Sequence, residues 1–208
     1  SAAWAAGYTG AGSRIAIIDT GADVDHPSLD PDALKYALQG SNATIMTEAD
    51  LTDEVLNQLN AYTRKAGLTA ADFYVNEKIP FGFNYVDADT DITHDNDTQG
   101  DHGSHVTGIA AGNRFVKDEA GNYVAALDSV MTQGVAPDAQ ILTMKVFGKR
   151  GGAYDSDYMV AIDDAMVLGA DAANLSLGGS FPGYSEYTEE KYRHILDEIV
   201  GSGMVVTI

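Results

Sequence analysis

Residues 14–21 read Arg-Ile-Ala-Ile-Ile-Asp-Thr-Gly, an apolar run that ends on a carboxylate, a threonine and a glycine. A short run that is mostly apolar and does not alternate is typical of a strand buried on both faces of a parallel sheet. Because open α/β sheets bind ligands at the carboxyl ends of their strands, Asp19 is a candidate functional residue. The alternative is a turn aspartate that caps its own loop through Thr20 and Gly21.

Strand and helix patterns alternate along the rest of the chain. Strands are expected at 81–86, 140–147, 172–177 and 204–208, and helices at 51–66, 102–112, 155–168 and 185–200. This alternation predicts βαβ units, and therefore an α/β fold in three layers with helices on both faces of one parallel sheet. A chain of 208 residues without an internal repeat or a linker predicts one domain over 1–208.

Composition narrows the classes of partner. The chain has 31 Asp and Glu against 12 Lys and Arg, and this net charge of −19 argues against binding to nucleic acid or to an anionic membrane surface. No stretch approaches the ~18 apolar residues of a membrane span, so no membrane insertion is expected. The absence of cysteine excludes disulfides and thiolate metal sites. A secreted or surface protein, or one that binds cations, fits this composition, and so does a generic soluble protein with an acidic surface.

A second polar segment supplies an imidazole. Residues 101–108 read Asp-His-Gly-Ser-His-Val-Thr-Gly, where a loop is expected to turn into a helix. Gly103 and Gly108 allow neighbouring backbone to approach closely, and the helix fixes the ring of His102. A general base needs an acceptor on its far ring nitrogen, and Asp19 can fill that role.

The helix that begins at His102 is expected to pack through Val106, Ile109 and Ala110. His105 follows His102 by three residues, but a His-x-x-His pair without further nearby ligands is weak support for a metal site. We therefore interpret His105 as a structural histidine with an internal hydrogen bond.

Three motifs in order carry a family resemblance: Ile-Asp-Thr-Gly at 18–21, His-Gly-Ser-His-Val-Thr-Gly at 102–108 and Asn-Leu-Ser-Leu-Gly-Gly at 174–179. Together with Gly-Tyr-Thr-Gly at 7–10 and Gly-Val-Ala-Pro at 134–137, they resemble the subtilisin-like serine proteases (subtilases, peptidase S8) over nearly the whole chain. The resemblance implies a serine endopeptidase that cleaves peptide bonds by a Ser-His-Asp mechanism and needs no cofactor for the chemistry. By position, His102 is then the base and Asp19 the residue that orients it.

The segment between the first two motifs is long and contains an insertion near 40–80. This insertion narrows the resemblance to one subgroup of the family. Together with the segment 78–85 and the acidic loop that follows it, the insertion resembles the lactocepin and C5a-peptidase type of cell-envelope protease. This subgroup implies a bacterial protein that is extracellular or attached to the cell surface.

The resemblance also implies a cleft that binds a polypeptide substrate as an extended strand. One edge is then Ser176, Leu177 and Gly178, and the opposite edge is Gly151, Gly152 and Ala153. Main-chain hydrogen bonds at both edges would supply affinity, and pockets for alternate side chains would supply specificity.

The third member of the catalytic set is expected to be absent from these 208 residues. The family nucleophile lies in a Gly-Thr-Ser sequence, which does not occur here, and Ser176 does not lie at a sharp strand-to-helix turn. The oxyanion asparagine of the family is likewise expected beyond residue 208. The sequence is thus interpreted as the N-terminal part of a catalytic domain, inactive alone and prone to self-associate through the strand at 204–208.

Two other functions are weighed against this one. The first is a non-catalytic, subtilase-derived module that binds peptides or a surface partner. The second is a metal-dependent hydrolase that uses His102, His105 and the acidic loop at 87–101. Six aspartates crowd this loop and suit calcium, namely Asp87, Asp89, Asp91, Asp95, Asp97 and Asp101, but the EF-hand pattern fails. The resemblance also implies a calcium ligand at the position of Ser28, where a serine replaces the usual aspartate. A structural calcium in the acidic loop and a solvated loop without calcium therefore remain two alternatives.

Overall fold

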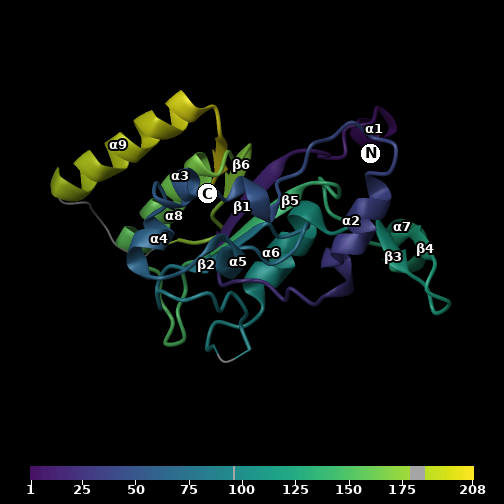
Figure 1. The fold of residues 1–208 in the computed structure, drawn as a ribbon, viewed down its shortest axis with the longest axis horizontal. Helices are drawn as coiled ribbons and strands as arrows, with labels where there is room; N and C mark the ends of the chain where they lie inside the picture. The colour runs from purple at the N-terminus through teal and green to yellow at the C-terminus, as the bar shows by residue number, and fades with distance from the viewer. Residues whose placement is uncertain (96, 179–185) are drawn as a thin grey trace.

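A five-stranded sheet forms the centre of the computed structural model, which describes residues 1–95, 97–178 and 186–208 (Figure 1). Its strands are β1 (Arg14–Asp19), β2 (Phe81–Asn84), β5 (Gln140–Lys145), β6 (Ala172–Asn174) and β7 (Val205–Thr207). They lie in the order β2-β5-β1-β6-β7, and every neighbouring pair is parallel. The predicted α/β fold with a parallel sheet is confirmed, although β6 ends three residues before the expected boundary.

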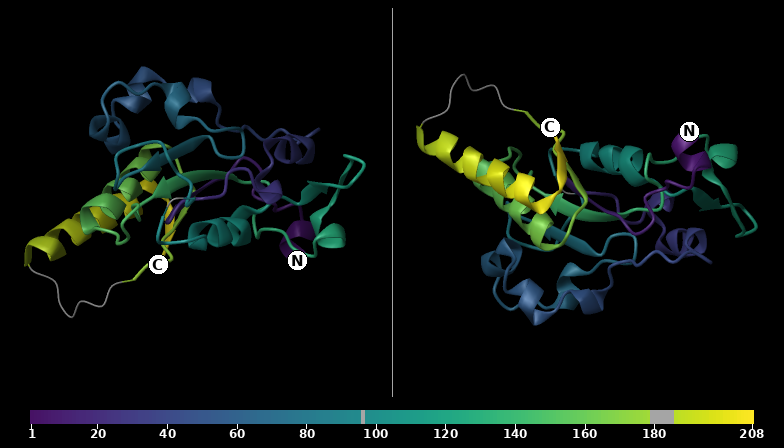
Figure 2. Two further views of the ribbon diagram at one scale, coloured as in Figure 1. Left: turned by 90° about the horizontal axis from the view of Figure 1, so that it is seen from below. Right: turned by 90° about the horizontal axis from the view of Figure 1, so that it is seen from above.

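Helices cover both faces of this sheet (Figure 2). They are α1 (Ala2–Ala5), η1 (Pro27–Leu29), α2 (Pro31–Ala37), η2 (Glu48–Asp50), α3 (Asp53–Leu56), α4 (Asn60–Arg64), α5 (Ala70–Phe73), α6 (His102–Ala111), α7 (Ala126–Ser129), α8 (Asp155–Val167) and α9 (Glu186–Ser202). A separate antiparallel hairpin joins β3 (Phe115–Lys117) to β4 (Tyr123–Ala125). Residue 185, the expected start of α9, lies outside the described residues. Within the described ranges, no helix combines the length and the apolar character needed to cross a bilayer.

Alternate residues of β1 face different layers, as the pleat of a strand requires. Ile15 and Ile17 pack in a small apolar cluster with residues of α6, whereas Ala16 and Ile18 belong to the larger cluster formed with α3, α4 and α8. Figure 2 shows α6 and the 48–73 segment on opposite sides of the sheet. Asp19 continues the odd-numbered series, so its side chain lies on the α6 side.

The helix expected over 51–66 is wrong in one respect. Its apolar face does pack into the core, but the structure has two short helices, α3 and α4, in its place. The carboxylate of Asp164 in α8 accepts the backbone N–H groups of Asn60 at 2.7 Å and of Ala61 at 2.9 Å, which starts a new helix there. Burial raises the pKa of the Asp164 carboxyl, and these donated hydrogen bonds oppose the rise. A tertiary cap thus breaks a helix that the local pattern would continue.

Candidate active site

Asp19 and His102 meet at the carboxyl edge of the sheet. The Nδ1 atom of His102 lies 2.7 Å from Oδ1 of Asp19, and the backbone N–H of Thr20 donates to the same oxygen at 2.7 Å. The Asp19 side chain is 1% exposed, whereas the His102 ring is 51% exposed. Because an ionised carboxylate only accepts hydrogen bonds, Nδ1 carries the proton and Nε2 is the basic nitrogen of the ring. The structure brings these residues together; their catalytic roles remain a prediction.

Two glycines allow the start of α6 to lie directly on the turn after β1. The N–H of Gly103 donates to Oγ1 of Thr20 at 2.8 Å, and a Cβ on Gly103 would stand only 2.2 Å from the carbonyl oxygen of Gly21. Gly21 has φ +108°, and a Cβ there would stand 2.2 Å from the carbonyl oxygen of Ile92. A side chain at Gly103 would therefore push the start of α6 away from the turn and separate His102 from its carboxylate partner, whereas one at Gly21 would collide with the backbone of Ile92.

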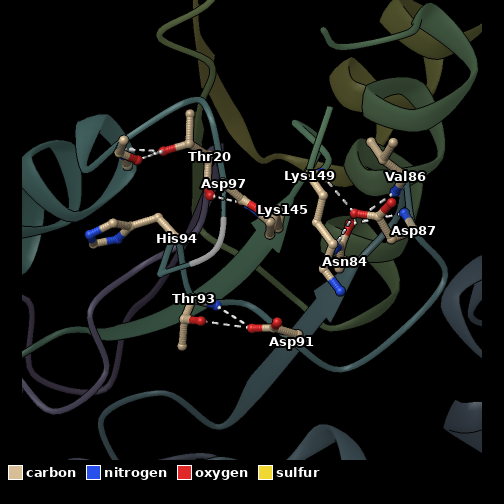
Figure 3. A network of polar contacts seen from close by, with 12 residues as sticks. Thr20, Asn84, Val86, Asp87, Asp91, Thr93, His94, Asp97, Lys145 and Lys149 are labelled. Carbon is tan, nitrogen blue, oxygen red and sulfur yellow. Dashed lines mark hydrogen bonds and ion pairs between the residues drawn. The ribbon is translucent and has the colours of Figure 1, made fainter. Parts of the chain in front are cut away.

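A buried ion pair lies beside this turn, and the sequence analysis did not predict it. Lys145 ends β5 and is the register partner of Asp19. Its Nζ pairs with the carboxylate of Asp97 and donates to the carbonyl of Thr20 at 2.5 Å (Figure 3). One sequence signal could have found Lys145, because like Asp19 it is a charged residue that ends a largely apolar strand.

The two predicted substrate-binding edges leave the sheet on either side of Asp19. Since β5 and β6 flank β1, the segments that follow them start from the same edge of the sheet. The predicted residues of both segments are half-buried or exposed, namely Gly151, Gly152 and Ala153 after β5, and Ser176, Leu177 and Gly178 after β6. Gly179, the last residue of the motif at 174–179, lies outside the described residues. Substrate binding at these edges remains a prediction.

Local contacts distinguish the two edges. Gly151 has φ +82°, and a Cβ there would stand 2.3 Å from Nε2 of Gln99, in the segment that leads into α6. At the other edge, Oγ of Ser176 accepts a hydrogen bond from Nδ2 of Asn174 at 2.9 Å. In the part of the chain that the structure describes, no hydrogen bond joins Ser176 to His102.

The expected packing of α6 is confirmed for Val106 and Ala110, which pack against the apolar cluster on that side of the sheet, but not for Ile109. Gly103, Thr107 and Ala111 are its buried residues, four positions apart, and Ile109 is 55% exposed. Small residues face the sheet because the helix begins so close to the backbone of the turn. The expectation for His105 is also wrong, since its side chain is exposed and its ring makes no hydrogen bond within residues 1–95, 97–178 and 186–208.

The other face of α6 lines a cleft of about 810 Å³. Its lining combines polar residues, namely His26, His94, His105, Ser28 and Ser104, with apolar ones, namely Leu29, Ile109, Val116, Val130 and Val135. Neither Asp19 nor His102 lines it, so this cleft is separate from the carboxylate–imidazole pair.

The carboxylates of the acidic loop are directed to different partners (Figure 3). Oδ2 of Asp87 accepts from Nδ2 of Asn84 and from the backbone N–H of Lys149, both at 3.1 Å. Oδ1 of Asp91 accepts from Oγ1 of Thr93 at 2.7 Å. Among the described residues, no group of three His, Asp or Glu side chains is arranged to hold a metal ion. A structural calcium in this loop therefore remains a prediction that only a binding measurement can test.

A buried carboxylate that orients an imidazole at the carboxyl edge of a parallel sheet is typical of hydrolases that activate a hydroxyl nucleophile. Comparison with known protein families leads to the same class. The model of the Subtilase family matches residues 10–207, and the chain belongs to this family.

Several bacterial proteases are similar to this chain. The PI-type proteinase of Lactococcus lactis subsp. cremoris is 35% identical over 178 residues, which are 82% of this chain and 8% of that protein. The minor extracellular protease Vpr of Bacillus subtilis (strain 168) is 30% identical over 183 residues, 86% of this chain and 15% of that protein. A C5a peptidase of Streptococcus pyogenes serotype M6 is 29% identical over 183 residues, 87% of this chain and 13% of that protein. These matches confirm the resemblance found in the sequence, and the chain spans only a small part of each relative.

Proposed function

We propose that this chain is the Asp- and His-bearing part of a serine endopeptidase. The observation that carries the proposal is the 2.7 Å contact between Oδ1 of Asp19 and Nδ1 of His102 at the carboxyl edge of the sheet. Membership of the Subtilase family and the names of the relatives, which are proteinases and peptidases, support cleavage of peptide bonds.

The chemistry follows from the tautomer that Asp19 imposes. With the proton on Nδ1, Nε2 of His102 takes the proton of a serine hydroxyl as its oxygen attacks the substrate carbonyl. Asp19 stabilises the imidazolium that forms, and Nε2 then returns the proton to the leaving amine. No Gly-Thr-Ser occurs in the 208 residues. The proposal therefore takes the nucleophile and the oxyanion donor from sequence beyond them, and the chain alone is inactive.

The proposed substrate is a polypeptide in extended conformation. It would lie between the segments 151–153 and 176–178, whose glycines leave room for a second backbone. One relative carries the word extracellular in its name, and we extend this location outside the cell to the longer protein.

A fluorophosphonate probe and a peptide-cleavage assay test the proposal. The probe should label the longer gene product and should not label residues 1–208. In the longer protein, Asp19→Asn should lower kcat by about 10⁴-fold, because the histidine loses its tautomer. Asp23→Asn is the matched control, since Asp23 lies on the same loop but lines the separate cleft, and kcat should stay unchanged.

Two results would overturn the proposal. Labelling of residues 1–208 would place a nucleophile inside them. A longer protein with Asp19 and His102 intact, but with no labelling and no cleavage, would leave a non-catalytic binding module instead.

A further inference from the structure

A buried ion pair joins the two segments that carry Asp19 and His102. The side chains of Lys145 and Asp97 are 1% and 3% exposed. Asp97 lies five residues before His102, and Lys145 also donates to the carbonyl of Thr20, the residue after Asp19. One cation therefore contacts both the turn after β1 and the approach to α6.

The path of the Lys145 side chain fixes this arrangement. Lys145 and Asp19 are register partners on neighbouring parallel strands, so both side chains lie on the α6 side of the sheet. A Cβ on Gly21 would stand 3.4 Å from Cδ of Lys145, which shows that the lysine runs directly beside the turn. Figure 3 shows its amine between Thr20 and Asp97.

The segment that leads into α6 has few other anchors in the interior. Thr98, Gly100 and Asp101 are exposed, and the carbonyl of Gly100 accepts from Oγ1 of Thr20 at 3.3 Å. A buried charge tolerates little displacement from its partner, because an unpaired charge in the interior is strongly unfavourable. The ion pair therefore restricts where this segment can lie relative to the turn.

We infer that Lys145 and Asp97 are positioning residues for the Asp19–His102 pair. They hold the turn at 19–21 and the approach to α6 at the separation at which Nδ1 of His102 donates to Asp19. Neither residue contacts the reacting atoms. The inference rests on the proposed function, because it assigns these two residues a role in the same site.

The chain offers a matched control in Lys149 and Asp89. Lys149 lies four residues after Lys145, and Asp89 lies in the same acidic loop as Asp97, but their charged atoms are 3.8 Å apart and the side chains are 47% and 33% exposed. This pair reaches neither the turn nor the approach to α6. It separates the effect of an ion pair in this region from the effect of the buried pair.

The test follows the Nδ1 proton of His102 by ¹H–¹⁵N NMR in the 208-residue chain. The wild-type protein should give a hydrogen-bonded Nδ1–H resonance that is lost in Asp19→Asn. The double variant Lys145→Met/Asp97→Leu buries no unpaired charge and should fold with near wild-type thermal stability. Its His102 resonance should nevertheless be lost, whereas Lys149→Met should keep it.

A second variant covers the case in which the double variant does not fold. Asp97→Asn keeps the size of the side chain and an acceptor for Lys145, and it should weaken the resonance while Asp89→Asn leaves it unchanged. If the folded double variant, or Asp97→Asn, retains the wild-type resonance, the ion pair is structural only and the inference is wrong. If the wild-type chain lacks the resonance, or Asp19→Asn leaves it unchanged, the proposed function itself fails.

Discussion

A buried lysine lies near each end of strand β5, and the two are held in different ways. At the carboxyl end, Lys145 pairs with a buried carboxylate and with the carbonyl of Thr20. At the amino end, Lys78 lies beside the strand, since the N–H of Ile141 donates to its carbonyl at 2.8 Å. Among the described residues, the amine of Lys78 donates to carbonyl oxygens alone, those of Pro137 at 3.0 Å and Ala139 at 2.7 Å.

At the carboxyl end of β5 the lysine is held by an ion pair, and we call this the charge-held end. At the amino end the buried lysine can lose its proton and its charge. Burial lowers the pKa of Lys78 to about 7, and the nearby carboxylate of Asp138 opposes this only in part. Nε of Arg114 lies 3.0 Å from Asp138, so this carboxylate already has a partner. A neutral amine can still donate hydrogen bonds, but it does not demand a charged partner at a fixed place. The charge-held end is the one that carries Asp19 and His102.

The largest expected effect comes from breaking the charge-held end. Lys145→Met should lower the free energy of unfolding by about 3–5 kcal/mol, because it leaves Asp97 buried without a partner. Lys78→Met leaves two carbonyls without a donor and no buried charge, and should cost about 1–3 kcal/mol. Urea unfolding at a mildly alkaline pH, at which Lys78 is neutral, measures both. Equal losses would show that the two ends do not differ as described.

A backbone contact at the same end gives the next largest effect. Gly103→Ala should cost about 3 kcal/mol, since its Cβ would stand 2.2 Å from the carbonyl oxygen of Gly21 and the backbone must move. The shift should also separate His102 from Asp19. Urea unfolding and the His102 Nδ1–H resonance measure the two consequences. A variant with wild-type stability would mean that α6 does not need this close approach.

At the charge-held end, one contact between side chains could be predicted from the sequence and another could not. Asp19 ends a strand and His102 starts a helix, and in a parallel α/β sheet both places lie at the same edge, so their proximity could be expected. The contact between Lys145 and Asp97 could not, because Asp97 is one of six aspartates in a loop and nothing local distinguishes it. The break between α3 and α4 was missed for a similar reason, since its cap, Asp164, lies 104 residues from Asn60. Local patterns predict elements, whereas contacts between distant polar side chains depend on the folded arrangement.

The pH dependence of the free energy of unfolding tests the account of Lys78 at the amino end of β5. The pKa of Lys78 is about 7 in the folded state against 10.5 for an ordinary lysine. Between these values the unfolded chain binds more protons than the folded chain. The free energy of unfolding of the protein should therefore rise with pH, and Lys78 contributes at most about 1.4 kcal/mol per pH unit to this rise. Below pH 7 the full cost of burying the charge applies, and it disappears as the pH approaches 10.5.

Urea unfolding of the wild type and of Lys78→Met from about pH 7 to about pH 9 measures this slope. The methionine variant should lack the Lys78 contribution, so its curve should be flatter. Lys35→Met is a suitable control, because Lys35 is half exposed and its carboxylate partners raise its pKa to about 12, outside the range of the experiment. Parallel curves for Lys78→Met and the wild type would show that the Lys78 amine keeps its proton in the folded protein.

The smallest expected effect has the opposite sign and uses the same helix. Gly108 lies about one and a half turns after Gly103 in α6, nearer the amino end of the sheet. A Cβ there would meet nothing within 4 Å. Gly108→Ala should therefore raise the free energy of unfolding by about 0.5–1 kcal/mol, because alanine loses less conformational entropy in a helix. The His102 resonance should stay as in the wild type. The effect of a glycine-to-alanine substitution on the free energy of unfolding thus changes sign between Gly103 and Gly108, because only Gly103 contacts the turn after β1. If both variants lose stability, α6 does not tolerate an added side chain even where that turn does not lie against it.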